Sequence, residues 1–469
     1  MVMESNGKGQ GMRAGAARVE ITPETNIHLS GAVSEFRPAQ LIVDPLYAKA
    51  LVLECGGNRI CLVTLDLTII TEEWTQRIRE AAARELGVAP DAVMVHATQT
   101  HSAPSLGHFM MDPDFPPVPE ELVWLQGGDP RYFEFAFDRI VEAIRRAGAV
   151  LEPVQMRAGT GIEGRLAFNR RAVMNTGRVF MPGPRWPEPL GPTRLRYLEG
   201  PIDPEVGVLW LQNERLRPVA MLLHYTCHPV NVFPKPHVSA DWPGAWADEM
   251  QQRASGDGVP MILNGCCGNI NPWDPFDPKY TPDHRRMGRV LAETTENVLH
   301  ASSCESDSTL AWKTEQVKLP IREVEPELLE QARATLAAQP NPPPMDETHR
   351  RVDGNWVQSA SVMSVQLHRQ RAPRLDYEIQ VFRIGSTAIV GLPGEPFVEG
   401  QLRIKMASPA ARTFVAHCTT HYVGYVPTRE AFDRGGHEVE TRYWSKLTPD
   451  ALDIVVAEAS RMLHDVFSA

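Results

Sequence analysis

The sequence lacks several features that would assign it to whole classes of protein. It has no excess of basic residues, since Lys and Arg number 47 against 58 Asp and Glu, a net charge of −11. That balance disfavours nucleic acid or an anionic membrane as the main partner, because both are bound through positive charge. No apolar run approaches the roughly 18 residues of a membrane span. The amino terminus has no apolar segment typical of a secretion signal.

Cysteine is scarce and follows no pattern. The seven cysteines are an odd number without the spacing of a disulfide framework. Cys266 and Cys267 are adjacent, which disfavours a disulfide between them. A reduced, cytoplasmic location is therefore expected, with most cysteines acting as small buried apolar residues.

The chain does have an ample core and a repeated α/β pattern. Its 469 residues are 43% hydrophobic and 22% charged, as in a soluble globular protein. Two strand-like runs flank Gly56-Gly57-Asn58, a helical pattern extends from Thr71 to Leu86, and the strand DAVMVHATQ follows. Strand, helix and strand at this spacing predict an α/β fold.

Further elements are predicted along the rest of the chain. Helices are expected at about 130–148 and from Asp241, and strand pairs are expected from VGVLWLQ with VAMLLHYTCH and from YEIQVFRIG with TAIVG. The run MILN is one more strand. We expect a flexible amino terminus at residues 1–13 and a single domain over 14–469, with a proline-rich linker at 340–344 inside it.

Polar residues recur where predicted strands end, and they are Gln99, His101, His228, Asn269, Asn271 and Glu395. Open α/β sheets build their sites at strand ends, where loops gather on a rigid scaffold. If the strand before Gln99 continued with a period of two, Gln99 and His101 would share one face and His96 the other.

Each candidate has a simpler explanation when it is taken singly. A lone histidine such as His228 is more often a hydrogen-bonded core residue than a metal ligand. Glu395 would be an ordinary loop carboxylate, and Tyr425 would serve packing. These residues become site candidates only if they belong together.

Six short motifs, in order, support that grouping. They are ATQTHSAP, FNRRA, YTCHPVNV with SADWPG, NGCCGNINP, LPGEPF and HYVGYVPTREAF. In order and approximate spacing, over roughly residues 14–445, they resemble the amino-terminal catalytic domain of the neutral/alkaline non-lysosomal ceramidases. The resemblance implies a layered αββα sandwich of mixed sheets, without the carboxy-terminal immunoglobulin-like domain of the bacterial enzymes.

The resemblance also implies a zinc site for amide hydrolysis. In that family two histidines, a glutamate and a tyrosine hold the ion, and three of these positions correspond to His228, Glu395 and Tyr425. Nitrogen and oxygen ligands with one open position suit a catalytic zinc, which acidifies bound water.

The fourth zinc position departs from the family, because its first histidine corresponds to Gln99. Glutamine can ligate only through a neutral carbonyl oxygen, a weaker and harder donor than imidazole. Four outcomes stay open: looser zinc binding, substitution by His101 or His96, a harder ion such as Mg²⁺ or Mn²⁺, or no metal.

The residues at the positions of the family's catalytic groups also differ from those of the family. Where the family carries a serine and an aspartate, this chain has Asn271 and Asn269, so attack by a serine is not available and Asn271 would orient the substrate or stabilise an oxyanion. The resemblance places Arg170 and His101 near the reacting group, and puts His437 at a family tyrosine. His437 could act as a general acid or base. Asp241 and Asn269 would support the site, although Asp241 could simply cap its helix.

These observations favour a metal-dependent hydrolase of an amide or related bond in a small polar substrate, using metal-activated water. Ceramide itself is disfavoured by the expected cytoplasmic location and the missing serine. Two alternatives remain: a metal-dependent lyase or isomerase on the same scaffold, and a non-catalytic binding protein with an altered site. We expect a small-molecule partner, no nucleic acid and no membrane span, and we leave open a homo-oligomer.

Overall fold

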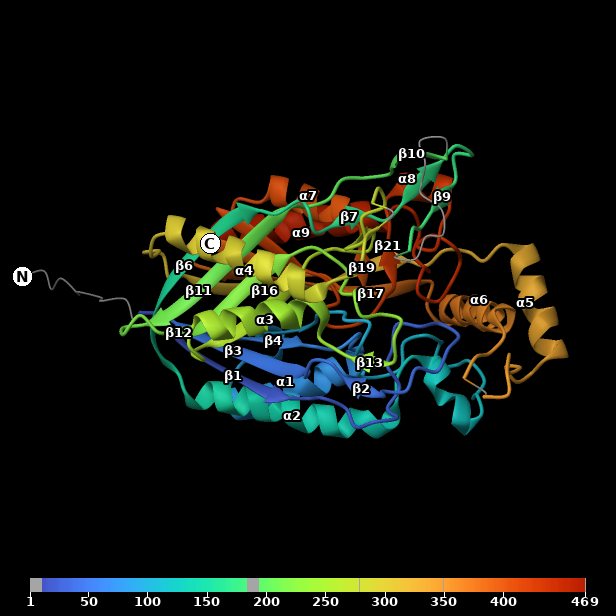
Figure 1. The fold of residues 1–469 in the computed structure, drawn as a ribbon, viewed down its shortest axis with the longest axis horizontal. Coiled ribbons are helices and arrows are strands. Elements are labelled where there is room, and N and C mark those ends of the chain that lie inside the picture. The colour runs from blue at the N-terminus through green and yellow to red at the C-terminus, as the bar shows by residue number, and fades with distance from the viewer. Residues whose placement is uncertain (1–10, 184–193, 278, 349, 469) are drawn as a thin grey trace, which may run out of the picture.

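The computed structural model describes residues 11–183, 194–277, 279–348 and 350–468. Of the expected flexible amino terminus, residues 1–10 lie outside these ranges. In the described part, two β-sheets pack face to face and helices cover their outer faces (Figure 1). The predicted αββα sandwich is therefore confirmed. Across these residues, no helix is both long enough and apolar enough to cross a bilayer.

The larger sheet contains eight strands in the order β14-β12-β11-β6-β1-β3-β4-β5. The pair at each edge, β12 with β14 and β4 with β5, is parallel, and the inner pairs are antiparallel. The strands are β1 (Arg13–Glu20), β3 (Tyr47–Cys55), β4 (Asn58–Leu65), β5 (Val93–Ala97), β6 (Glu152–Ile162), β11 (Glu205–Asn213), β12 (Pro218–Tyr225) and β14 (Val259–Asn264).

The smaller sheet contains four strands in the order β16-β17-β18-β20. Only β18 and β20 run parallel, and the other neighbours are antiparallel. Its strands are β16 (Leu310–Pro320), β17 (Arg374–Ile384), β18 (Thr387–Gly391) and β20 (Arg412–Ala416).

Apolar side chains from both sheets fill the layer between them. Leu62 and Leu222 enter from the larger sheet, and Phe382 and Phe414 enter from the smaller one. The approach is close at Gly207 in β11, where an added Cβ would lie 2.2 Å from Cε1 of Phe414. Because interiors are close-packed, this layer fixes the separation of the two sheets.

Helices cover both outer faces of the sandwich (Figure 1). On the larger sheet, α1 and α2 lie over the β1–β5 half and α3 and α4 over the β6–β14 half, while α7 and α9 cover the smaller sheet. The helix pair α5 and α6 extends from one end of the sandwich. The helices are α1 (Glu72–Leu86), α2 (Pro130–Ala149), α3 (Asp241–Arg253), α4 (His284–Ala301), α5 (Pro326–Ala338), α6 (Gly354–Arg371), α7 (Val398–Ala407), α8 (Arg429–Arg434) and α9 (Ala451–Ser468), with 3₁₀ turns η1 (Pro90–Ala92) and η2 (Glu120–Gln126).

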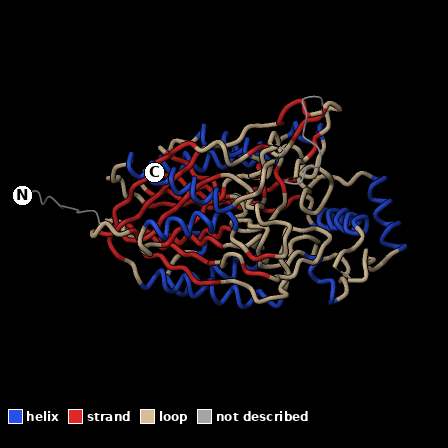
Figure 2. Tube along the Cα trace, in the orientation of Figure 1, coloured by secondary structure: helices blue, strands red, loops and turns tan. Residues whose placement is uncertain are grey.

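Each parallel strand pair of the two main sheets is joined by one α-helix, as β4-α1-β5, β12-α3-β14 and β18-α7-β20. Such a crossover brings the carboxyl ends of both strands to the same edge of a sheet. Loops gather beyond one end of the strands (Figure 2). Short strands lie outside the two main sheets, and they are β2 (Leu41–Ile42), β7 (Phe168–Asn169), β8 (Ala172–Met174), β9 (Val179–Phe180), β10 (Leu195–Leu198), β13 (His237–Val238), β15 (Ile270–Asn271), β19 (Glu395–Pro396) and β21 (Tyr425–Val426).

The predicted strands and helices are confirmed, with one informative difference. The strand expected to run through Gln99 ends at Ala97. Gln99 has a φ of 66°, in the left-handed region that a strand cannot contain. The chain therefore turns at Gln99, and the alternation of faces expected for His96, Gln99 and His101 does not extend that far.

Candidate active site

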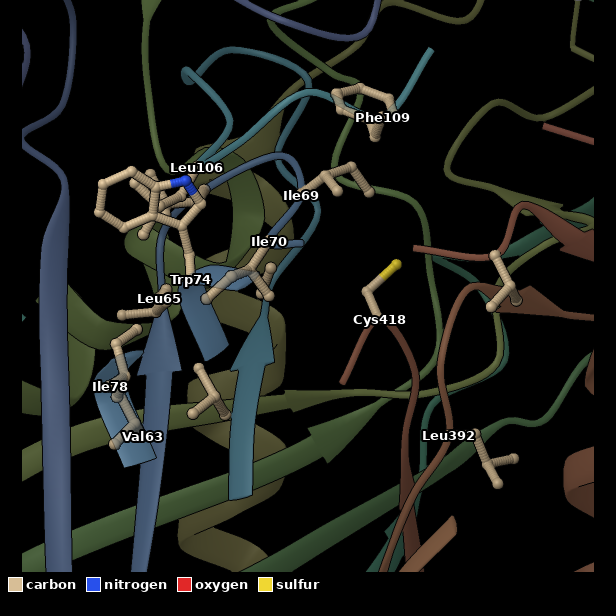
Figure 3. Close-up of a cluster of buried hydrophobic side chains, with 14 of the residues drawn as sticks. Val63, Leu65, Ile69, Ile70, Trp74, Ile78, Leu106, Phe109, Leu392 and Cys418 are labelled. Atoms are coloured by element: carbon tan, nitrogen blue, oxygen red, sulfur yellow. The ribbon is translucent and has the colours of Figure 1, made fainter. Parts of the chain in front are cut away.

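A cavity of about 70 Å³ lies beyond the strand ends and is walled by loops from both sheets. Ile69 and Phe109, two apolar residues of this wall, lie beyond β4 and α1 in Figure 3. The lining residues are His28, Ser30, Gly31, Ala32, Val33, Thr68, Ile69, Gln99, His101, Phe109, Met110, Gly127, Glu395, Tyr422, Tyr425, His437 and Trp444. The candidates Gln99, His101, Glu395, Tyr425 and His437 therefore share one cavity.

Glu395 and Tyr425 are neighbours in a short parallel pair, β19 with β21. The backbone N–H of Glu395 donates to Gly424 O at 2.8 Å. Gly394, at φ 69°, allows this approach, because an added Cβ would lie 2.4 Å from Gly424 O. The loops after β18 and β20 are thus held together by backbone contacts, and they present the carboxylate and the phenol to the same cavity.

His228 meets Glu395 across the boundary between the two sheets. Its Nε2 lies 3.1 Å from Oε2 of Glu395, and its Nδ1 lies 3.1 Å from Ile270 O. A carbonyl oxygen can only accept, so Nδ1 carries a proton. In a neutral ring Nε2 then has a lone pair that faces a carboxylate oxygen. The contact is favourable only if Nε2 is also protonated or if both atoms share a cation.

Tyr422 donates a 2.6 Å hydrogen bond to the other oxygen of Glu395. Burial alone would raise the pKa of Glu395, but the hydrogen bonds from His228 and Tyr422 and the charge of Arg170 lower it well below its usual range. The carboxylate is therefore ionised at neutral pH. Tyr422 was not predicted as a site residue, although the motif HYVGYV contains two tyrosines, Tyr422 and Tyr425.

The side-chain amide of Gln99 lies against His417, a residue that was not predicted from the sequence. Its Oε1 lies 2.9 Å from Nε2 of His417 and 3.7 Å from Sγ of Cys267. Burial lowers the pKa of His417 to about 4. His96, by contrast, is occupied by backbone groups, with Nδ1 at 2.6 Å from His417 O and Nε2 accepting from the N–H of Asn264 at 3.1 Å. Neither ring nitrogen of His96 is free to replace a metal ligand.

Arg170 links a buried carboxylate to the phenol of Tyr425. Its Nε donates to Glu438 at 2.8 Å, its Nη2 donates to the Tyr425 oxygen at 3.0 Å, and its Nη1 approaches Asn271 Oδ1 at 3.4 Å. The short strand pair β7 with β15 places Arg170 beside the loop that contains Asn269 and Asn271. The backbone N–H of Arg170 donates to Asn269 O at 2.8 Å. Glu438, which is 1% exposed, was not predicted from the sequence either.

The two catalytic histidine candidates line the cavity without a side-chain hydrogen bond to any described residue. The ring of His101 lies 5.5 Å from that of His228, and the ring of His437 lies 5.6 Å from that of Tyr425. Burial, with a contribution from His228, lowers the pKa of His101 to about 3. Burial also lowers the pKa of His437, against the raising effect of Glu438. Both rings are therefore neutral at physiological pH.

Asp241 and Asn269 hold loops in place. Asp241 accepts from Asn231 at 2.8 Å and from the Val232 N–H at 2.9 Å, which fixes the segment that follows His228. Asn269 accepts from the N–H of Val398, the first residue of α7, at 3.0 Å. Their hydrogen bonds hold neighbouring loop segments and side chains, and neither residue lines the cavity.

Two solved structures of ceramidases share the architecture of this chain. Neutral ceramidase from Pseudomonas aeruginosa matches with a TM-score of 0.70 and 20% identity, over 97% of this chain and 74% of that one. A ceramidase complexed with C2 matches with a TM-score of 0.71 and 19% identity, over 97% and 75%. This chain has the neutral ceramidase fold. No protein-family model and no curated protein matches the sequence.

The motif resemblance predicts a zinc site, and the side chains present can be compared with that prediction. No cluster of three or more His, Cys, Asp or Glu side chains in the described ranges could hold a metal ion. A site would therefore need an oxygen of Tyr425 or Gln99 beside His228 and Glu395. The paired orientation of His228 Nε2 and Glu395 Oε2 fits a shared divalent cation.

Proposed function

We propose that the chain is a metal-dependent hydrolase that cleaves an amide or related bond in a small polar molecule. The contact between His228 and Glu395 carries the proposal. Nδ1 of His228 donates to Ile270 O, so Nε2 faces Oε2 of Glu395 at 3.1 Å either with a second proton or with a cation between the two atoms. A divalent cation held by both atoms would remove the repulsion between two acceptors.

We assign His228, Glu395 and Tyr425 as ligands, with the carbonyl oxygen of Gln99 as a weaker fourth. Nitrogen and oxygen donors suit zinc, and the additional amide oxygen also suits Mg²⁺ or Mn²⁺. When bound, such an ion polarises the scissile carbonyl and acidifies a water molecule.

The remaining polar groups would orient the substrate and move protons. Arg170 holds the phenol of Tyr425 in place through the hydrogen bond at 3.0 Å. Its positive charge would stabilise the oxyanion that develops on the substrate. Asn271, which cannot act as a nucleophile, would donate from its amide. His437 is neutral and lines the cavity, so it would take a proton from water and return it to the leaving amine. His101 is a weaker base because its pKa falls to about 3.

The dimensions of the cavity favour a small substrate. Its volume is about 70 Å³, and polar side chains line it together with apolar ones such as Met110 and Trp444. A long acyl chain would need a continuous apolar groove instead.

The test combines metal analysis with isotope labelling. Purified protein would be assayed on a panel of short N-acyl amides in ¹⁸O-water, with and without chelator. Hydrolysis places ¹⁸O in the released acid, whereas a lyase or isomerase step need not. His228→Ala and Glu395→Gln should abolish both metal retention and turnover. Full turnover in either variant, or turnover unaffected by exhaustive chelation, would refute the proposal.

A further inference from the structure

The cavity wall formed by residues 28–33 has no part in the chemistry proposed above. His28, Ser30 and Gly31 line the cavity. In the sequence they lie in the segment that connects β1 to β3. Gly31 lies against His101, since an added Cβ would be 2.6 Å from its Nδ1. This wall is therefore next to the reacting groups.

His28 offers the cavity one hydrogen-bond donor. Its Nδ1 accepts from the N–H of Arg37 at 3.2 Å, so the proton of the neutral ring is on Nε2. Burial and the charge of Arg37 lower the pKa of His28 to about 3, which keeps the ring neutral. Phe36 stacks on the ring at 5.5 Å and Trp124 lies 5.6 Å away, so the ring is fixed. The side chain is 1% exposed, and no residue in the described part of the chain hydrogen-bonds to Nε2.

Arg37 adds a positive charge behind the same wall. It is 2% exposed, and its guanidinium donates to the carbonyls of Ser30 at 3.0 Å, His101 at 2.9 Å and Lys235 at 3.1 Å. Carbonyl groups do not cancel a full charge, and Arg37 forms no ion pair with any described carboxylate. Its Nε has no partner among the described residues.

Besides Glu395, which lines the same cavity, two carboxylates lie near this wall, and both form their ion pairs elsewhere. Asp129 accepts from the backbone N–H of His28 at 3.0 Å but forms its ion pair with Arg131 at 2.6 Å. Glu35 pairs with Arg351 at 3.3 Å. The wall therefore combines a free N–H donor with a cation that has no ion pair of its own, two features that stabilise a bound anion.

We propose that this wall binds a carboxylate of the substrate, with His28 Nε2–H as the donor and Arg37 as the countercharge. The inference rests on the proposed function and narrows it: the substrates are amides that also carry a carboxylate, such as short N-acyl amino acids. The carboxylate would be held at His28 while the amide faces Glu395 and His228.

Paired ligands that differ only in charge provide the test. N-acetylglycine and N-acetylglycinamide would be titrated calorimetrically into the full-length protein, with and without chelator. The wild type should bind the acid at least about tenfold more tightly than the amide. His28→Phe should lose that preference, and His28→Gln, which keeps an N–H donor, should retain part of it. His464→Phe, which removes an exposed histidine of α9, is the matched control and should change nothing.

The outcomes separate this inference from the proposed function. A preference that vanishes on chelation would mean that the carboxylate binds a metal ion, which overturns the role of His28 while leaving hydrolysis intact. A preference that persists in a protein without turnover of any amide would refute the hydrolase but support the binding wall. Equal binding of both ligands, binding of neither, or an undiminished preference in His28→Phe would overturn the inference.

Discussion

Replacing Glu395 by glutamine separates the metal-binding role of this residue from its role in packing. Without metal, the buried contact with His228 requires a doubly protonated ring. In Glu395→Gln the amide N–H could donate to the lone pair of neutral His228, and Tyr422 could still donate to the amide oxygen. Exchanging a buried ion pair for matched neutral groups is often close to neutral in free energy. We therefore expect the free energies of unfolding of the metal-free variant and the metal-free wild type to differ by no more than about 1 kcal/mol.

The response to metal should differ between the two proteins. A ligand at a hundred times its dissociation constant adds ~2.7 kcal/mol to the free energy of unfolding. For 469 residues unfolding as one unit, an entropy of ~2.1 cal/mol/K per residue makes 1 kcal/mol equivalent to about 1 °C. Zinc should thus raise the melting temperature of the wild type by about 3 °C and that of Glu395→Gln hardly at all.

The melting temperatures of both proteins would be measured by differential scanning calorimetry with chelator, Zn²⁺, Mn²⁺ or Mg²⁺. Glu399→Gln is the matched control, because this carboxylate lies four residues further on and binds Asn269 rather than the cavity, so it should respond like the wild type. A wild type indifferent to all three ions, or a variant that responds as strongly as the wild type, would refute the metal assignment.

Three further predictions follow from the same contacts. Arg170→Lys keeps the charge but cannot donate to a carboxylate and a phenol at once, so kcat should fall about 10–100-fold in steady-state assays; an unchanged kcat would contradict this role. Gly31→Ala should cost ~1–3 kcal/mol and lower activity, because its Cβ would strike the ring of His101, whereas Gly57→Ala, also at positive φ but with open space around it, should leave activity intact. Burial lowers the pKa of Lys446 to about 7, so between pH 7 and about 10 the unfolded chain holds one more proton than the folded one. In urea unfolding, the free energy of unfolding of the wild type should therefore rise by ~1.4 kcal/mol per pH unit over this range relative to that of Lys446→Met. Parallel pH profiles of the two proteins would exclude the lowered pKa of Lys446.

The sequence revealed the fold and the cavity-lining loops because their signals are local. The hairpin around Gly56-Gly57-Asn58 and the helix that follows are encoded by turn residues and periodicity. Parallel strand pairs then bring successive loops to one edge, so polar residues after separate strands could be expected to converge. Gln99, Glu395 and Tyr425 do line one cavity.

The partners of these residues could not be predicted in the same way. Tyr422 lies 27 residues from Glu395 and His417 lies 318 residues from Gln99. Nothing in a local pattern states which side chain another will contact over such separations. The left-handed turn at Gln99 could not be predicted either, because glutamine has no preference for that backbone conformation.

Because Gln99 and His228 follow strands of the larger sheet while Glu395 and Tyr425 follow strands of the smaller one, the candidate site lies on a seam. The thickness of the apolar layer beneath it, where Phe414 presses on Gly207, acts as a spacer that sets how far apart the two halves stand. In the proposed metal site, a methylene gained or lost in this layer would change the distance between the ligands on the two sheets, and with it the affinity for the cation.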